Sequence, residues 1–247
     1  MAALGPRLAK LPPLGWALVA ITVLVTANWV VQVVRKPTEL FALVRGPEPL
    51  PPAETWARYG ARCREDATSL VRAEVLAALV QAESAGDPLA RTYWRWRLSW
   101  NPFEIYAPAS SAVGILQITD GTFAEARRYC VHDHVVAQDG PWWDPTTCWF
   151  NALYFRTSPG DSIEMTAARL HVIAAELCAR RPRAPTAAEL TGLLAVVHLC
   201  GRERGEAFAA RGFRLAPGER CGDHDAREYV ERVKALAAAF ARMDGGR

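Results

Sequence analysis

A single glutamate near a predicted helix end is the strongest candidate for chemistry in this sequence. Glu83 follows Leu79 and Val80 at helical spacing, so we expect its carboxyl group at the edge of the core. Gly86 and Pro88 end that helix and place Glu83 in the last turn, beside the negative end of the helix dipole. The dipole and desolvation both disfavour the ionised carboxylate, and both are expected to raise the pKa of Glu83.

A carboxylic acid that stays protonated near neutral pH has the property needed to protonate a glycosidic oxygen. Taken alone, the same glutamate also fits a solvated residue at a helix end. Glu104 and Asp120 lie nearby in the sequence. A hydrolytic reaction that uses a second carboxylate therefore stays open.

Three segments of the sequence together indicate a family. They are Glu83-Ser84, the stretch from Ser110-Ser111 through Gly114-Ile115-Leu116-Gln117, and Tyr229-Val230 at the start of a late helix. In this order the segments resemble the lysozyme-like lytic transglycosylases of the soluble-lytic-transglycosylase type, in the superfamily of the goose-type lysozymes. The resemblance covers about residues 65–243 and implies an all-α, lysozyme-like helical domain.

The resemblance also implies roles for individual residues. Glu83 would be the only general acid and then the general base, and the Tyr229 hydroxyl would orient it. Substrate binding and support would come from Ser84, Ser110, Ser111, Gly114, Gln117, His198 and Tyr229. The competing interpretations are a turn residue for Gln117, a cap for Ser110 and a core aromatic for Tyr229.

Two stretches depart from the family pattern. Val197-His198-Leu199-Cys200-Gly201 stands where the family usually has Ala-Tyr-Asn-Ala-Gly, which puts one substrate contact in doubt. The stretch 91–102 looks inserted and contains Trp94, Trp96 and Trp100. These indoles are expected either to stack on sugar rings or to anchor the segment on the body of the domain.

The implied reaction cleaves the β-1,4 bond between N-acetylmuramic acid and N-acetylglucosamine. The 6-hydroxyl of the muramic acid acts as an internal nucleophile and gives a 1,6-anhydro product, so its effective concentration replaces a second carboxylate. The expected partner is the peptidoglycan strand, and no cofactor or metal is expected. The alternatives are a muramidase, which hydrolyses the same bond, and an inactive peptidoglycan-binding or assembly protein.

Other chemistries have weaker support. His132, Asp133, His134, Asp139 and Asp144 are possible metal ligands, but their spacing matches no established zinc pattern. The same holds for the pair His224-Asp225. The sequence contains no Gly-x-Ser-x-Gly motif for a serine nucleophile.

The N-terminal region predicts export. Residues 14–34 carry no charge and are long enough, at about 1.5 Å per residue, to cross a hydrocarbon core of about 30 Å. We expect an uncleaved anchor in the inner membrane of a bacterial cell, with residues 1–13 in the cytoplasm and the rest in the periplasm. The alternative is a signal peptide cleaved near Ala27, after the small-residue pattern Val25-Thr26-Ala27.

All six cysteines follow this segment. In an oxidising compartment the usual outcome for an even number of cysteines is a set of disulfides. We expect Cys130–Cys148 and Cys200–Cys221, which close loops of roughly 20 residues, and Cys63–Cys178 between helices.

The remaining sequence predicts a linker and one domain. Residues 35–55 are rich in proline, which indicates a semi-rigid spacer. Residues 56–243 are expected to form the all-α domain. Capping boxes are expected at Thr122/Glu125, Asp161/Glu164, Thr186/Glu189 and Asp225/Glu228. A net charge of +3 over 247 residues is too small for a dedicated nucleic-acid binder.

Overall fold

The computed structural model describes residues 12–36 and 38–245 and is mostly helical, with 57% helix and 9% strand. Most of the predicted cytoplasmic segment 1–13 lies outside the described residues. The chain forms two compact units. The larger unit contains residues 46–91 and the chain from 112 onward, and the smaller contains the described residues up to Arg45 together with Thr92–Ser111.

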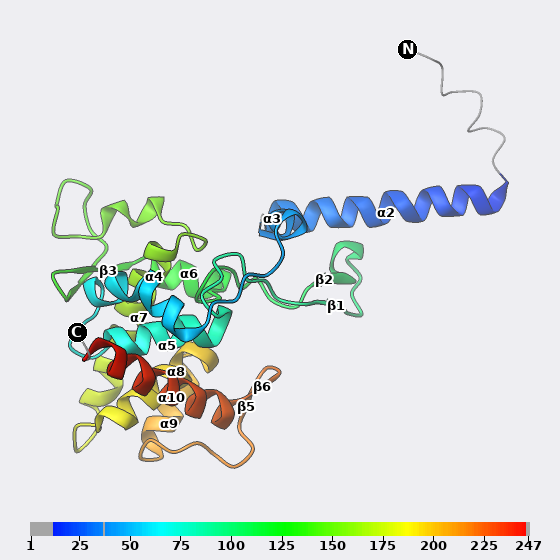
Figure 1. The fold of residues 1–247 in the computed structure, drawn as a ribbon. Helices are drawn as coiled ribbons and strands as arrows, with labels where there is room; N and C mark the ends of the chain where they lie inside the picture. Colours follow the sequence, from blue (N-terminus) through cyan, green and yellow to red (C-terminus); the bar gives the residue numbers. More distant parts are fainter. Residues whose placement is uncertain (1–11, 37, 246–247) are drawn as a thin grey trace. The chain divides into compact units, whose positions relative to one another are not determined.

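The larger unit is built mainly from helices. They are α4 (Pro52–Glu65), α5 (Ala73–Ser84), α6 (Asp120–Ala126), α7 (Pro159–Ala179), α8 (Ala187–Cys200), α9 (Arg202–Ala210) and α10 (Ala226–Asp244), with a 3-10 turn η2 (Trp149–Leu153). Helix α5 packs against both α4 and α10, as Figure 1 shows, and α10 also packs against α8. Leu76, Leu79 and Val80 of α5 are fully buried, so the predicted apolar face of this helix is confirmed.

Helix caps follow the sequence predictions only in part. Thr186 and Glu189 form the expected capping box of α8, and Asp225 accepts hydrogen bonds from two backbone amides at the start of α10. The other two predicted boxes are wrong. Helix α6 begins at Asp120 and is capped by Thr119, so Thr122 lies inside its first turn. Helix α7 begins at Pro159, so Asp161 lies inside its first turn. Proline fits the first helical turn well and moves that helix start upstream.

The described residues form three short antiparallel hairpins, which the all-α prediction does not include. They are β1 (Trp94–Trp96) with β2 (Tyr106–Pro108), β3 (Tyr129–His132) with β4 (Val135–Gln138), and β5 (Arg220–Cys221) with β6 (His224–Asp225). Each strand has two to four residues. Strands this short are too brief for an alternating pattern to stand out in the sequence.

The predicted linker 35–55 is not a continuous spacer. Helix α3 (Thr38–Val44) occupies a proline-free stretch inside it, and α4 begins at Pro52. Part of the remainder binds the end of α5. The Leu50 amide donates to the Ala85 carbonyl at 2.7 Å, and the Gln81 side chain donates to the Leu50 carbonyl at 3.0 Å.

Two of the three predicted disulfides are present. Cys130–Cys148 and Cys200–Cys221 have Cα separations of 5.6 and 5.3 Å, which are ordinary values for a disulfide. The third prediction is wrong, because Cys63 and Cys178 are both free thiols. Cys63 is next to Arg62, which binds Glu164 near the start of α7. Cys178 is near the other end of α7, about 20 Å further along the axis at about 1.5 Å per residue.

The smaller unit begins with α2 (Pro13–Arg35), a helix long and apolar enough to cross a membrane, as residues 14–34 predicted. The unit also contains α3, the β1–β2 hairpin and a 3-10 turn, η1 (Pro102–Glu104). An apolar N-terminal helix is compatible with an anchor or a signal sequence, and the two disulfides indicate an oxidising compartment.

Candidate active site

Glu83 lies in the last turn of α5, as predicted. The helix ends at Ser84, because Ala85 and Gly86 both adopt a left-handed backbone with φ of 50° and 75°. Only 15% of the Glu83 side chain is exposed. The core position of α5 and its abrupt end therefore place a carboxyl group where the core meets the surface.

Tyr229 is the direct partner of Glu83. It lies in the first turns of α10, and its hydroxyl donates a hydrogen bond to Oε1 of Glu83. Tyr229 is itself buried, and the guanidinium of Arg232 lies over its ring at 5.5 Å. The expected pairing of these two residues is therefore present in the structure.

The surroundings raise the pKa of Glu83 to about 7. Burial is the largest cause, because it removes water from the charged form. The Tyr229 hydrogen bond and the positive charge of Arg232 oppose this rise by stabilising the carboxylate. Near neutral pH the protonated and ionised forms of Glu83 are present in comparable amounts, which suits a group that first donates and then accepts a proton.

His198 is the third member of the cluster. It lies in the last turn of α8, and its Nε2 is 3.5 Å from Oε1 of Glu83. Burial and, to a smaller extent, the positive charge of Arg169 lower the pKa of His198 to about 4, against the opposing effect of a hydrogen bond to the Leu116 backbone. His198 is therefore neutral at pH 7, and its contact with Glu83 is not an ion pair.

The turn from Gly114 to Gln117 is joined to the end of α5. Oγ of Ser84 lies 2.8 Å from the Ile115 carbonyl, to which it donates. Gly114 has φ of 79°, and a Cβ there would lie 2.1 Å from the carbonyl oxygen of Arg156. Glycine is therefore required at this position for both backbone conformation and space.

Gln117 is held within its own turn. It has φ of 45°, and its side-chain nitrogen donates to the Gly114 carbonyl at 2.8 Å and the Ala90 carbonyl at 3.0 Å. The structure thus brings together Glu83, Ser84, the Gly114–Gln117 turn, His198 and Tyr229, which come from four separate segments. Ser84 and Gln117 make backbone contacts in this arrangement and act as supports.

The remaining predicted site residues belong to the smaller unit. The Ser110 carbonyl accepts a hydrogen bond from Thr92, and Ser111 follows it at the end of that unit. Trp94 donates from Nε1 to Glu39 at 3.0 Å, Trp96 stacks on Tyr106, and Trp100 is fully exposed. The hydrogen bond to Glu39 shows that Trp94 is packed against its own unit.

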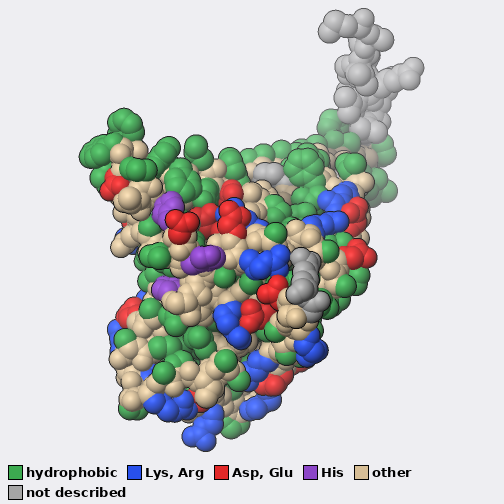
Figure 2. Space-filling model, turned by 60° about the vertical axis from the view of Figure 1, so that its left-hand side comes forward, with side chains coloured by type: hydrophobic (Ala, Val, Ile, Leu, Met, Phe, Trp, Pro, Cys, Tyr) green, Lys and Arg blue, Asp and Glu red, His purple; other side chains and the backbone are tan. Residues whose placement is uncertain are grey.

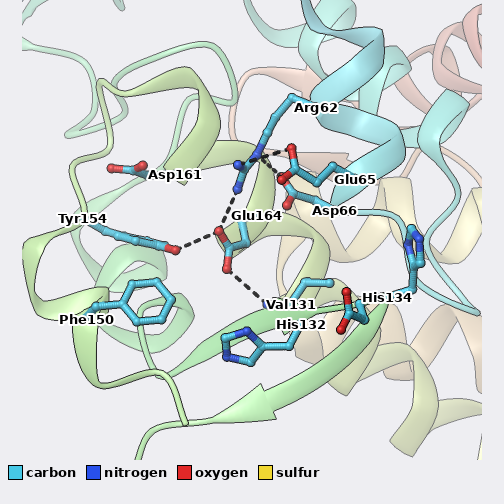
Figure 3. Close-up of a pocket in the computed structure, with 11 residues that line it drawn as sticks. Arg62, Glu65, Asp66, Val131, His132, His134, Phe150, Tyr154, Asp161 and Glu164 are labelled. Atoms are coloured by element: carbon cyan, nitrogen blue, oxygen red, sulfur yellow. Dashed lines mark hydrogen bonds and ion pairs between the residues drawn. The ribbon is translucent and has the colours of Figure 1, made fainter. Parts of the chain in front are cut away.

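A second polar region of the larger unit was not anticipated. Figure 2 shows histidine and acidic side chains gathered on one face of the molecule. A pocket of about 530 Å³ in the larger unit is lined by Arg62, Glu65, Asp66, Val131, His132, Asp133, His134, Phe150, Tyr154, Asp161 and Glu164 (Figure 3). It shares no residue with the Glu83 cluster.

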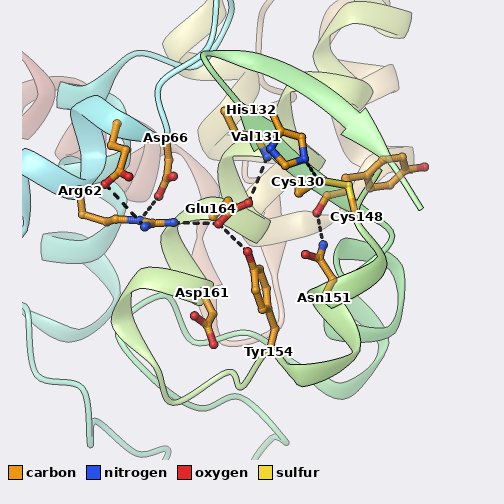
Figure 4. Close-up of polar contacts among 12 residues, drawn as sticks. Arg62, Asp66, Cys130, Val131, His132, Cys148, Asn151, Tyr154, Asp161 and Glu164 are labelled. Atoms are coloured by element: carbon orange, nitrogen blue, oxygen red, sulfur yellow. Dashed lines mark hydrogen bonds and ion pairs between the residues drawn. A yellow bond between two sulfur atoms is a disulfide. The ribbon is translucent and has the colours of Figure 1, made fainter. Parts of the chain in front are cut away.

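Glu164 is the centre of this pocket. Its carboxylate accepts hydrogen bonds from Arg62 at 2.7 Å, Tyr154 at 2.7 Å and the Val131 amide at 3.1 Å (Figure 4). Arg62 also binds Asp66 at 2.6 Å, and burial raises the pKa of the Asp66 carboxyl to about 7 against the opposing charge of Arg62. The network joins α4, β3 and the chain after η2 to α7.

The sequence contains a signal for this network. Glu164, which the spacing to Asp161 predicts as part of a helix cap, lies instead in a stretch of α7 that is buried on all sides from Ser162 to Leu170. Arg62 and Asp66 have the i,i+4 spacing of a helical ion pair. The adjacent residues His132 and His134 contact Cys130 and the Ala67 carbonyl.

A scan of the chain against protein-family models and a search of curated proteins both found no match. The assignment of a function therefore depends on the geometry around Glu83 and on the motifs that the sequence carries.

Proposed function

We propose that this protein is a peptidoglycan lytic transglycosylase with a lysozyme-like catalytic domain and with Glu83 as its general acid and base. The observation that carries the proposal is the bond between Tyr229 and a buried Glu83 whose pKa is raised to about 7. The Glu83-Ser84 and Gly114–Gln117 motifs add support, because Ser84 joins them through the Ile115 carbonyl.

Glu83 would act twice in the reaction. In its protonated form it gives a proton to the glycosidic oxygen, and the bond from that oxygen to C1 of the muramic acid breaks. The resulting carboxylate then takes the proton of the muramic acid 6-hydroxyl as the 6-oxygen bonds to C1. This step forms the 1,6-anhydro ring and returns Glu83 to its protonated form without consuming water.

The surroundings of Glu83 favour this route over a paired-carboxylate hydrolase. Among the described residues, the groups that bind Glu83 or shift its pKa electrostatically are Tyr229 and Arg232, and His198 is its close neighbour. None of these three is a carboxylate. An internal hydroxyl nucleophile needs no second acidic residue to activate water.

The proposed location follows from the N-terminal helix. We infer that α2 is retained as an anchor in the inner membrane and that the larger unit faces the peptidoglycan in the periplasm. The apolar helix and the two disulfides support a membrane-bound, extracytoplasmic protein.

The deciding experiment is digestion of purified peptidoglycan sacculi by the full chain, followed by mass spectrometry of the soluble products. We expect 1,6-anhydro-muramic acid ends. We expect Glu83→Gln to abolish product formation while circular dichroism shows an unchanged fold. The matched control is Glu231→Gln, an exposed glutamate on α10 that should retain full activity.

Two results would overturn the proposal. Reducing muramic acid ends would identify a muramidase. Intact sacculi after incubation with the wild-type chain, together with retention of the protein on the sacculi, would identify a binding protein.

A further inference from the structure

The β1–β2 hairpin is attached to the apolar helix α2. The side chain of Asn28 donates to the Tyr106 carbonyl at 2.8 Å, and the side chain of Gln32 donates to the Phe103 carbonyl at 2.5 Å. Gln32 is buried in this contact although it belongs to an otherwise exposed helix. The two amides therefore dock the hairpin along the side of α2.

The base of the hairpin is fixed by a second set of contacts. Lys36 donates to the Thr92 hydroxyl at 3.1 Å and lies 3.5 Å from Glu39, which accepts from Nε1 of Trp94 at 3.0 Å. Lys36 and Glu39 are both buried. Helices α2 and α3 and the hairpin thus form one joined unit.

The outer part of the hairpin presents apolar side chains to its surroundings. Leu98 and Trp100 are fully exposed, and Trp96 is 75% exposed. The polar groups of the tip bind one another, since the Ser99 hydroxyl and the Asn101 amide both donate to Glu104 at 3.2 Å. The tip is therefore ordered by its own bonds, while Leu98 and Trp100 are fully exposed and Trp96 stays largely exposed although it stacks on Tyr106.

The docking position sets the depth of the hairpin relative to a bilayer crossed by α2. The apolar stretch 14–34 is about 31 Å long, close to a hydrocarbon core of about 30 Å. Asn28 precedes Val34 by about 9 Å along the axis. A segment bonded to Asn28 and Gln32 consequently lies within roughly the outer 9 Å of the hydrocarbon core, next to the headgroup layer where tryptophan is enriched in membrane proteins.

We propose that the hairpin tip, formed by Trp96, Leu98 and Trp100, inserts into the interfacial layer of the same bilayer that α2 crosses. The inserted surface is apolar, and the exposed Arg95 beside it suits lipid phosphate groups. In the chain, the hairpin follows α5, which carries Glu83, and precedes the Gly114–Gln117 turn. The hairpin would therefore be a second membrane attachment, located in the chain between Glu83 and the Gly114–Gln117 turn.

This inference replaces the sugar-stacking role considered for the three tryptophans. It requires that α2 remain attached, but it is independent of whether Glu83 cleaves glycan. The occupant is a lipid surface, because the hairpin is hydrogen-bonded to the one helix among the described residues that can span a membrane.

The test uses the full chain in nanodiscs of phosphatidylethanolamine and phosphatidylglycerol. An environment-sensitive fluorophore is placed on Leu98→Cys in a Cys178→Ser background, which leaves only the buried Cys63 as a native free thiol. The matched control is the same label on Val135→Cys, an exposed position at a hairpin of the larger unit. Both positions are exposed, so the label should leave the fold unchanged, as circular dichroism would show.

We expect blue-shifted emission at position 98 and quenching by lipids that carry a nitroxide near the headgroup, with neither effect at position 135. Water-like emission at position 98 would overturn the proposal. A blue shift at position 98 that arises only on addition of peptidoglycan fragments would overturn it in favour of a glycan-binding tip. An intact mass showing that α2 has been removed from the mature chain would also overturn it.

Discussion

The hydroxyl of Tyr229 donates a hydrogen bond to the carboxylate of Glu83 across 146 positions of the chain. This bond fixes the orientation of the carboxyl group. Burial without the bond would keep Glu83 protonated up to a higher pH. The bond lowers the pKa of Glu83 against the effect of burial. The balance between the two effects leads to the first prediction.

Tyr229→Phe is expected to move the pH profile of activity. Without the hydroxyl the carboxylate loses a stabilising partner, so the pKa of Glu83 rises and the alkaline limb of kcat/KM shifts to higher pH. We also expect kcat to fall about 10- to 100-fold, the equivalent of about 1.5–3 kcal/mol for a hydrogen bond to a charged group. Rates of product release from sacculi across pH measure both effects. Tyr93→Phe, on an exposed side chain, is the control, and a shift to lower pH would contradict the prediction.

Glu83→Gln is expected to change how stability depends on pH. The folded-state pKa of about 7 lies above the ordinary value of 4.5, so the protonated form adds stability that is complete below pH 4.5 and is lost as pH rises through 7. At pH 8 the glutamine variant should therefore exceed the wild type by at most about 3 kcal/mol, and the difference should shrink toward pH 4. Urea unfolding at both pH values gives the comparison.

Asp66 has a pKa raised to about 7 as well, so some loss of stability with rising pH should persist in the Glu83→Gln variant. Asp66→Asn in the same background separates the two contributions. Parallel stability curves for the wild type and Glu83→Gln would contradict the assignment of the raised pKa to Glu83.

Gly114→Ala is expected to destabilise the fold. The added Cβ would lie 2.1 Å from the Arg156 carbonyl oxygen, and the backbone has φ of 79°, so both strain and overlap oppose the change. We expect a loss of about 2–4 kcal/mol in thermal or chemical unfolding. Gly121→Ala is the control, because nothing lies within 4 Å of its added Cβ, and it should leave Tm unchanged or raise it. Equal effects of the two variants would refute the packing argument.

Glu164→Gln is expected to weaken the polar network between α4, β3 and α7. The substitution removes the charge that faces Arg62 and leaves the Arg62, Tyr154 and Val131 donors with a poorer acceptor. We expect a loss of about 2–4 kcal/mol in urea unfolding. Glu65→Gln, at a largely exposed position of the same pocket, should cost less than about 0.5 kcal/mol. A loss at Glu65 as large as that at Glu164 would argue against Glu164 as the centre of the network.

The cysteine pairing predicts a simple labelling result. Alkylation of the unfolded, unreduced chain should modify two thiols, Cys63 and Cys178, whereas a three-disulfide protein would take up no label. In the folded chain Cys178 should react first, because burial raises the pKa of the Cys63 thiol to about 12. Reduction of the two disulfides should lower Tm, since each contributes about 3 kcal/mol to the free energy of unfolding. Intact mass and a thermal melt measure both outcomes.

Much of the local structure could be predicted from neighbouring residues. The spacing of Leu79, Val80 and Glu83, together with Gly86, placed a glutamate in the last turn of a buried helix, because apolar periodicity and helix termination depend on residues within a few positions of one another. The apolar stretch 14–34 predicted α2 for the same reason. The capping box at Thr186 was also correct, whereas the helix start at Pro159 was missed.

The contacts that join distant segments were decided by the tertiary structure. Packing of α5 against α10 and proximity to α8 bring Tyr229 and His198 to Glu83. Burial, the Tyr229 hydrogen bond and the charge of Arg232 set the pKa of Glu83. The length of α7 separates Cys63 from Cys178, and the same helix joins Arg62 to Glu164 across 102 positions. The sequence by itself thus determined which helix carries Glu83 in its last turn. Only the folded chain determined the partners and the pKa of Glu83, because desolvation and hydrogen bonding arise from residues that meet through packing.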